Sequence, residues 1–164
     1  MIPIVSIVGK SDSGKTTLIE RLIPEIKRRG YRIATVKHDT HSFEIDREGK
    51  DSYRHKKAGA AISLISSPEK VAVIADVDRD MNLSELRDQF VSNVDLIISE
   101  WYYRDSQPKI EVFREAAHGE PLCKKDDNLV AFVSDVPFDK GVPCFGLDEI
   151  ERIANFIEER FLKK

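Results

Sequence analysis

A glycine-rich octapeptide, placed between an apolar strand pattern and a helix pattern, constrains the fold of this chain more than any other feature. Residues 9–16 read Gly-Lys-Ser-Asp-Ser-Gly-Lys-Thr and match G-x-x-x-x-G-K-[ST] at every fixed position. A β-branched apolar run precedes them at residues 4–8, and apolar residues follow at helical spacing over residues 16–29. Strand, loop and helix in this order predict a phosphate-binding loop. The alternative is an ordinary strand-to-helix turn with a solvated lysine.

The residue types in this loop suit a nucleoside triphosphate. Gly9 and Gly14 allow the backbone to curl until successive N–H groups point at phosphate oxygens. Lys15 is predicted to reach the β- and γ-phosphates and to act in catalysis, and the Thr16 hydroxyl is predicted to ligate Mg²⁺. The following helix adds the partial positive charge of its N-terminus. The other residues predicted to contact the nucleotide are Ser11, Asp12, Ser13 and Thr17; for Thr17, a plain helix position is an equal alternative.

A phosphate-binding loop needs a carboxylate at the end of a neighbouring strand to hold Mg²⁺ directly or through water. Glu100 follows the apolar run 96–99 directly and is the first candidate, as a metal ligand with Thr16 or as a residue that orients water. Asp39 follows the run 33–36 and is a second catalytic candidate at the same edge of the sheet. The alternatives are an exposed acid at the end of a strand and an acid that forms a turn.

Strand and helix patterns alternate at both ends of the chain, which is typical of a parallel sheet with helices packed on it. Strands at 62–65 and 71–75 stand close together around the turn 66–68 and suggest an antiparallel excursion, whereas the polar stretch 40–54 predicts loop. We therefore expect an α/β fold with a mostly parallel sheet flanked by helices, a small antiparallel β-excursion in the middle, and one domain over residues 1–164. Further strands are predicted at residues 109–114 and 129–133.

Three helices carry end signals or breaks. Pro24 lies inside the first helix pattern and predicts a kink or an early end there. Ser84 is placed to cap a helix over residues 85–93. Asp148 and Glu151 are placed as the cap and the capping-box partner of a final helix over residues 149–162.

Composition excludes several classes of partner. The chain has 26 Lys and Arg against 29 Asp and Glu, a formal net charge of −3. Without a basic excess, duplex nucleic acid and anionic membranes are not expected partners. The apolar run at the start is too short to span a bilayer. The two cysteines form no C-x-x-C pair, which favours reduced thiols in a cytoplasmic protein.

Several segments together resemble the molybdopterin-guanine dinucleotide biosynthesis accessory protein B (MobB) family. The resemblance spans nearly the whole chain, and its most specific part is Gly-Lys-Asp-Ser-Tyr at residues 49–53. One position differs, because Trp101 follows Glu100 where the family usually has glycine. The segments that carry the resemblance are the phosphate-binding loop with residues 17–18, Lys-His-Asp at 37–39, residues 49–53, Ala-Gly-Ala at 58–60, residues 95–100, Pro-Lys-Ile at 108–110 and Ser-Asp-Val-Pro at 134–137.

The resemblance implies a homodimeric GTP-binding protein with weak, Mg²⁺-dependent GTPase activity. Its implied partner is the guanylyltransferase that joins GMP to molybdopterin, and its implied fold is a P-loop α/β domain with an added β-excursion. Within the segment 49–53, Lys50 and Asp51 are expected to meet the nucleotide, the pterin or the partner, with Asp51 or Ser52 capping a short helix. A solvated charged face is the alternative.

The choice of base is open at this point. No N-K-x-D guanine motif occurs; residues 123–126 are a degenerate echo, and Asp135, directly after the strand at 129–133, is better placed to read a base. GTP rather than ATP therefore follows from the resemblance and not from spacing. Two other functions stay open: a small-molecule P-loop kinase, and a nucleotide-gated binding module without meaningful turnover.

Overall fold

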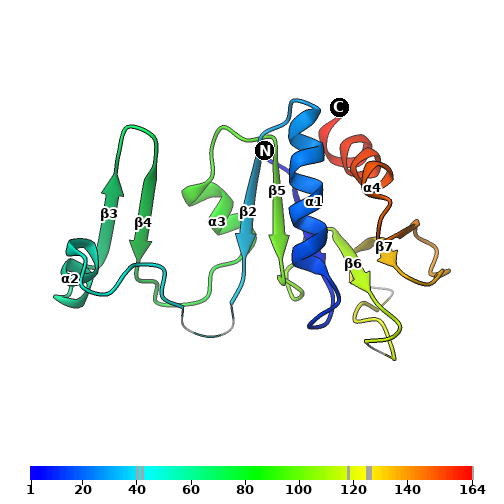
Figure 1. The fold of residues 1–164 in the computed structure, drawn as a ribbon, viewed down its shortest axis with the longest axis horizontal. Coiled ribbons are helices and arrows are strands. Elements are labelled where there is room, and N and C mark those ends of the chain that lie inside the picture. The colour runs from blue at the N-terminus through cyan, green and yellow to red at the C-terminus, as the bar shows by residue number, and fades with distance from the viewer. Residues whose placement is uncertain (40, 42, 118, 125–126, 164) are drawn as a thin grey trace. The chain divides into compact units, whose positions relative to one another are not determined.

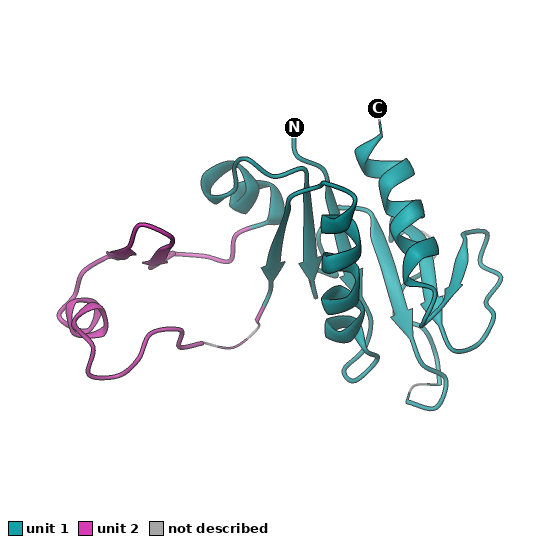
Figure 2. Ribbon diagram, turned by 45° about the horizontal axis from the view of Figure 1, so that its top comes forward, with its two compact units in different colours: residues 1–38, 82–164 teal, residues 39–81 magenta. Residues whose placement is uncertain are grey.

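A computed structural model describes residues 1–39, 41, 43–117, 119–124 and 127–163. The chain divides into two compact units, one formed by residues 1–38 and 82–164 and the other by residues 39–81 (Figure 2). The single domain expected over residues 1–164 stays a prediction, because two compact units can still fold together as one domain.

The first unit is built on a six-stranded sheet in which every pairing is parallel. Its strand order is β2-β5-β1-β6-β7-β8, so β1 lies between β5 and β6. The predicted parallel sheet is confirmed, and β8 is an addition that the sequence pattern missed because it has three residues. The strands are β1 (Ile4–Val8), β2 (Ile33–Lys37), β5 (Leu96–Glu100), β6 (Lys109–Phe113), β7 (Leu129–Ser134) and β8 (Cys144–Gly146).

Helices cover both faces of this sheet (Figure 1). On one face, α1 (Lys15–Arg28) packs beside α4 (Ile150–Ile157), and Leu22 and Ile153 are fully buried against the strands. On the other face, α3 (Leu83–Phe90) buries Leu83 against Ile4 and Ile97. Each such side chain contributes about 1.5–3 kcal/mol by leaving water. None of the helices in the described residues is long and apolar enough to cross a membrane.

The helix ends differ from three predictions. Helix α1 continues through Pro24 to Arg28, so the early end is wrong. Helix α3 is capped by Asn82, whose side chain accepts from the Glu85 N–H in a capping box, and not by Ser84. Helix α4 has Glu149 at its N-cap and no side-chain cap hydrogen bond, so Asp148 and Glu151 form no capping box; the Asp148 carboxylate pairs with Arg21 from α1.

Beyond its first eight residues, the last helix also changes type. The predicted helix at 149–162 consists of α4 over Ile150–Ile157 and a π-helical segment over Glu158–Leu162. Periodicity located this helix, but local propensity does not distinguish α from π hydrogen bonding.

The second unit contains the predicted antiparallel excursion. Strands β3 (Ile62–Ser66) and β4 (Val71–Ala75) pair with Leu64 opposite Val73, which confirms the expected hairpin. A short helix, α2 (Asp51–Lys57), precedes β3 and takes up the end of the stretch predicted as loop. One face of the hairpin carries large exposed apolar side chains, namely Ile62, Leu64, Val71 and Val73.

Candidate nucleotide-binding site

The loop between β1 and α1 has a backbone that glycine makes possible. Gly9 has a φ of 149°, and a Cβ there would lie 2.3 Å from the carbonyl oxygen of Val112 on β6. Gly14 has a φ of 98° and directly precedes the first turn of α1. A side chain at residue 9 would push the loop away from β6, so the close approach of loop and sheet requires glycine.

Ser13 is the buried polar residue of this loop. The residue is fully buried, and its hydroxyl has no hydrogen-bond partner among the described residues. A buried hydroxyl without a partner costs about 1–3 kcal/mol, so such groups call for an explanation. A phosphate oxygen held in the loop would supply the missing partner.

The ammonium of Lys15 folds back across the loop. Its Nζ donates a hydrogen bond of 2.8 Å to the carbonyl of Lys10 and lies 5.0 Å from the centre of the Trp101 ring. Burial lowers the pKa of Lys15, the carboxylates of Glu100 and Asp12 act in the opposite direction, and the charge of Lys37 lowers it further. A partly buried cation held by a carbonyl and an aromatic face gains from an anionic ligand.

Thr16 and Glu100 come together at the carboxyl edge of the sheet. The Thr16 hydroxyl donates a hydrogen bond of 2.8 Å to a carboxylate oxygen of Glu100. The parallel register of β1 and β5 places Glu100 opposite Ile7, two residues before the loop begins. Hydroxyl and carboxylate oxygens are ligands that Mg²⁺ prefers, and Mg²⁺ keeps several waters besides them. The residues present therefore fit a magnesium ion bound together with phosphates.

The remaining loop residues and Asp135 lie on the same unit. Ser11, Asp12 and Thr17 are exposed around the loop and the first turn of α1, and Asp12 has a φ of 60°. Asp135 follows β7, and its Oδ1 accepts a hydrogen bond of 3.0 Å from the Glu115 N–H. The structure thus brings Ser13, Lys15, Thr16 and Glu100 into one cluster, with Asp135 after the second strand from β1.

Three other predicted site residues belong to the unit formed by residues 39–81. Asp39 accepts a hydrogen bond of 3.0 Å from the His41 N–H. Lys50 is the N-cap residue of α2, and Asp51 is its first residue. Neither Asp51 nor Ser52 caps this helix, because α2 has no side-chain cap hydrogen bond, so that part of the prediction is wrong.

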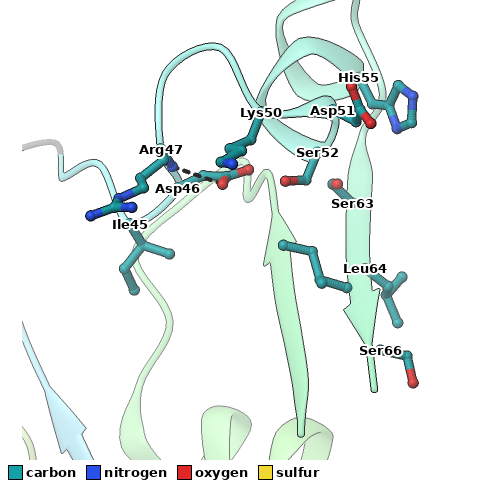
Figure 3. A pocket seen from close by; sticks show the side chains of 11 residues that line it. Ile45, Asp46, Arg47, Lys50, Asp51, Ser52, His55, Ser63, Leu64 and Ser66 are labelled. Atoms are coloured by element: carbon teal, nitrogen blue, oxygen red, sulfur yellow. Dashed lines mark hydrogen bonds between the residues drawn. The ribbon is translucent and has the colours of Figure 1, made fainter.

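Lys50 and Asp51 line an open pocket of about 760 Å³ within this unit. Figure 3 shows that its lining comes from the segment before α2, from α2 itself and from β3. Asp46 accepts a hydrogen bond from the Arg47 N–H, and its other carboxylate oxygen is buried without a partner among the described residues. The polar side chains around the pocket are Asp46, Arg47, Lys50, Asp51, Ser52, His55, Ser63 and Ser66.

Arg114 also lies against the loop, and no motif in the sequence indicated it. Its Nε donates a hydrogen bond of 3.2 Å to the carbonyl of Ser13 in the phosphate-binding loop. A basic residue directly after the apolar strand at 109–113 was the available signal, but nothing local indicated that β6 lies beside β1. Residues 125–126 of the degenerate N-K-x-D echo lie outside the described residues.

A sequence model for "Molybdopterin guanine dinucleotide synthesis protein B" (MobB) matches residues 4–135 of this chain. The chain belongs to the MobB family. It is 35% identical to the molybdopterin-guanine dinucleotide biosynthesis adapter protein of Haemophilus influenzae, over 96% of this chain and 88% of that protein. It is 33% identical to the adapter protein of Escherichia coli, over 100% of this chain and 96% of that one. The family predicted from the sequence is therefore confirmed.

Solved structures support the same assignment. The crystal structure of a molybdopterin-guanine biosynthesis protein B matches with a TM-score of 0.77 and 34% identity, over 98% of this chain and 99% of that chain. The MobB structure from Bacillus subtilis matches with a TM-score of 0.79 over 99% of this chain and all of that chain. At 24% identity, the Bacillus structure supports the fold alone.

Proposed function

We propose that this protein is a GTP-binding accessory protein that assists the conversion of molybdopterin to its guanine dinucleotide form. The family and the adapter role named for the Haemophilus and Escherichia relatives support the pathway. Nucleotide binding is supported by one observation above all, the cluster of Lys15, Thr16 and Glu100 around a phosphate-binding loop. In this proposal the protein acts in the cytoplasm as a homodimer, with the guanylyltransferase as its partner.

Each residue of the cluster has a distinct task in this proposal. The backbone N–H groups of residues 9–15 and the Lys15 ammonium hold the β- and γ-phosphates, and the Ser13 hydroxyl pairs with a phosphate oxygen. Thr16 and Glu100 would hold Mg²⁺ directly or through water, and the ion would supply positive charge beside the phosphates. Glu100 would also orient a water molecule toward the γ-phosphate, which is the arrangement that slow hydrolysis of GTP requires.

Asp135 is the proposed reader of guanine. Its Oδ1 accepts from the Glu115 N–H, which fixes the carboxylate beside the end of β7 and leaves Oδ2 to accept from the ring and amino N–H groups of guanine. Lys50 and Asp51, on the second unit, are proposed to contact the nucleotide, the pterin or the partner enzyme through the pocket that they line. Asp39 is proposed as the second acidic residue for metal or water, should Glu100 prove to be structural.

Calorimetric titration of GTP and ATP, each with and without Mg²⁺, tests the proposal. The wild type should prefer GTP, and Lys15→Ala should bind it at least tenfold more weakly, because a charge-assisted contact contributes about 1.5–3 kcal/mol. Lys27→Ala is the matched control, because this exposed lysine lies at the opposite end of α1. Equal GTP affinity in wild type and Lys15→Ala, with equal circular dichroism, would contradict the proposal.

A hydrolysis assay separates the related functions. If the wild type releases phosphate slowly from GTP and Lys15→Ala does not, the protein is a weak GTPase. If the wild type binds GTP without releasing phosphate, it is a nucleotide-gated binding module. Transfer of phosphate to an added small-molecule acceptor would instead favour a kinase. The effect of the protein on dinucleotide formation by a guanylyltransferase then tests the accessory role directly.

A further inference from the structure

Arg114 emerges from the sheet directly beside the phosphate-binding loop. All five residues of β6 are buried, and Arg114 is the first residue after them, at the carboxyl edge of the strand that pairs with β1. Its Nε donates to the Ser13 carbonyl at 3.2 Å, and guanidinium atoms lie 3.4–3.9 Å from the position that a Cβ on Gly14 would occupy. The planar group therefore lies against the Ser13–Gly14 peptide.

This contact places the guanidinium on the flank of the loop and outside the phosphate cradle. In a phosphate-binding loop the N–H groups face the phosphates, and a carbonyl such as that of Ser13 points away from them. Among the described residues, the Ser13 carbonyl is the one acceptor bound by the Arg114 side chain, and no acidic side chain pairs with it. Most of its five N–H donors and one planar face are left for a ligand.

The next residue connects the same segment to Asp135. The Glu115 N–H donates to Asp135 Oδ1 at 3.0 Å, and the register of β6 and β7 sets Phe113 opposite Ser134. Arg114 thus contacts the phosphate-binding loop, and its neighbour Glu115 contacts the Asp135 carboxylate. Since β6 lies between β1 and β7, Arg114 is placed at the sheet edge between the loop after β1 and Asp135 after β7.

We propose that Arg114 contacts the nucleoside half of the bound nucleotide, with its guanidinium plane against the purine or ribose and its Nε on the Ser13 carbonyl. A planar guanidinium stacks on aromatic faces, which an ammonium does not reproduce. Arg114 therefore adds affinity for the nucleoside and not for the triphosphate. This inference rests on the proposed nucleotide-binding function, and it assigns a residue to the half of the ligand that the loop does not hold.

Titrations of GTP and of inorganic tripolyphosphate, both with Mg²⁺, test this inference on wild type, Arg114→Ala, Arg114→Lys and Arg28→Ala. Arg28→Ala removes an exposed arginine at the far end of α1 and should bind both ligands as the wild type does. Arg114→Ala should bind GTP about tenfold more weakly and tripolyphosphate with unchanged affinity. Arg114→Lys should remain weakened for GTP, because lysine can donate to the Ser13 carbonyl but has no planar face.

Two results would overturn the inference. Equal loss of affinity for GTP and tripolyphosphate would make Arg114 a phosphate ligand, and wild-type affinity of both Arg114 variants for GTP would make it a surface residue. If Arg114→Ala melts at a lower temperature than the wild type, its weaker GTP binding could reflect a destabilised fold. The GTP affinity of Arg114→Lys then decides the question, because this variant retains the charge and a donor to the loop. Failure of wild type to bind either ligand would instead contradict the proposed function itself.

Discussion

The hydroxyl of Thr16 lies 2.8 Å from a carboxylate oxygen of Glu100, although 84 residues separate them in the chain. The contact exists because β1 and β5 are adjacent parallel strands, so the start of α1 and the end of β5 share one edge of the sheet. It brings together a hydroxyl and a carboxylate oxygen, which are ligand types that Mg²⁺ prefers.

The first prediction concerns metal dependence. Glu100→Gln keeps an acceptor for the Thr16 hydroxyl but removes the negative charge, and Thr16→Ala removes the hydroxyl. Both variants should lose at least tenfold in the Mg²⁺-dependent part of GTP affinity, while binding measured with a chelator present stays unchanged. Calorimetry at several Mg²⁺ concentrations measures this difference. If Glu100→Gln retains the metal dependence and hydrolysis rate of the wild type, Glu100 is structural and Asp39 becomes the candidate.

The second prediction uses the single tryptophan of the chain as a reporter. The centre of the Trp101 ring lies 5.0 Å from the Lys15 Nζ, and a triphosphate would draw that ammonium away from the ring. GTP should therefore change the tryptophan emission of the wild type, and Lys15→Ala should show no such change at the same GTP concentration. An emission change of equal size in both proteins would show that Trp101 does not respond to the movement of Lys15.

The third prediction concerns a buried carboxylate behind the site. Glu111 on β6 is 1% exposed and accepts hydrogen bonds from the backbone N–H groups of Leu122 and Cys123. Glu111→Ala leaves both amides without a partner and should lower the free energy of unfolding by about 2–5 kcal/mol. Urea denaturation measures the loss. Glu120→Ala, at an exposed position, is the control and should unfold as the wild type does.

The fourth prediction concerns alkaline stability. The Tyr103 hydroxyl donates a hydrogen bond of 2.7 Å to Asp127, and this bond together with burial raises the pKa of Tyr103 to about 12. Since the folded-state pKa exceeds the unfolded value of about 10, the contribution of Tyr103 is complete below pH 10 and is lost as the pH rises toward 12. Tyr103→Phe should therefore be less stable than wild type at neutral pH, and the gap should narrow above pH 10.

Denaturant titrations of wild type and Tyr103→Phe at neutral and alkaline pH measure whether the difference in stability narrows as predicted. A phenol absorbance titration should show one tyrosine fewer ionising late in Tyr103→Phe than in the wild type. Tyr31, whose pKa is also raised by burial and by its hydrogen bond to Glu158, ionises late in both proteins. A gap in stability that stays constant across the alkaline range would mean that the hydroxyl contributes without titrating.

The fifth prediction separates the two residues at the start of α2. Lys50 is exposed, so Lys50→Ala should melt as the wild type does while supporting less dinucleotide formation by the guanylyltransferase. Asp51 makes no cap hydrogen bond, so Asp51→Ala should cost less stability than the loss of a typical cap, about 0.5–2 kcal/mol. Melting temperature and dinucleotide formation are measured on both variants. Wild-type activity of Lys50→Ala would favour a solvated face for residues 49–53.

Local signals were sufficient for the parts of this protein whose chemistry lies in contiguous residues. The loop at 9–16 was predictable because its glycines, lysine and threonine each have a position that the backbone conformation dictates. Glu100 was predictable because a carboxylate after a buried strand reaches the edge where the loop lies. The hairpin of β3 and β4 was predictable from two apolar runs around a turn.

Other features were decided by contacts between distant segments. The order β2-β5-β1-β6-β7-β8, the three-residue strand β8 and the cap of α3 at Asn82 depend on pairing and packing that no short window of sequence contains. The same holds for the buried hydroxyl of Ser13 and for Arg114, which meets the loop because β6 lies beside β1. The sequence by itself determined the family, the glycine-rich loop between strand and helix, and the position of Glu100 at the end of a buried strand, because these follow from residue types at set spacing. Only the tertiary structure decided which side chains surround that loop, since the pairing of parallel strands brings together residues about a hundred positions apart.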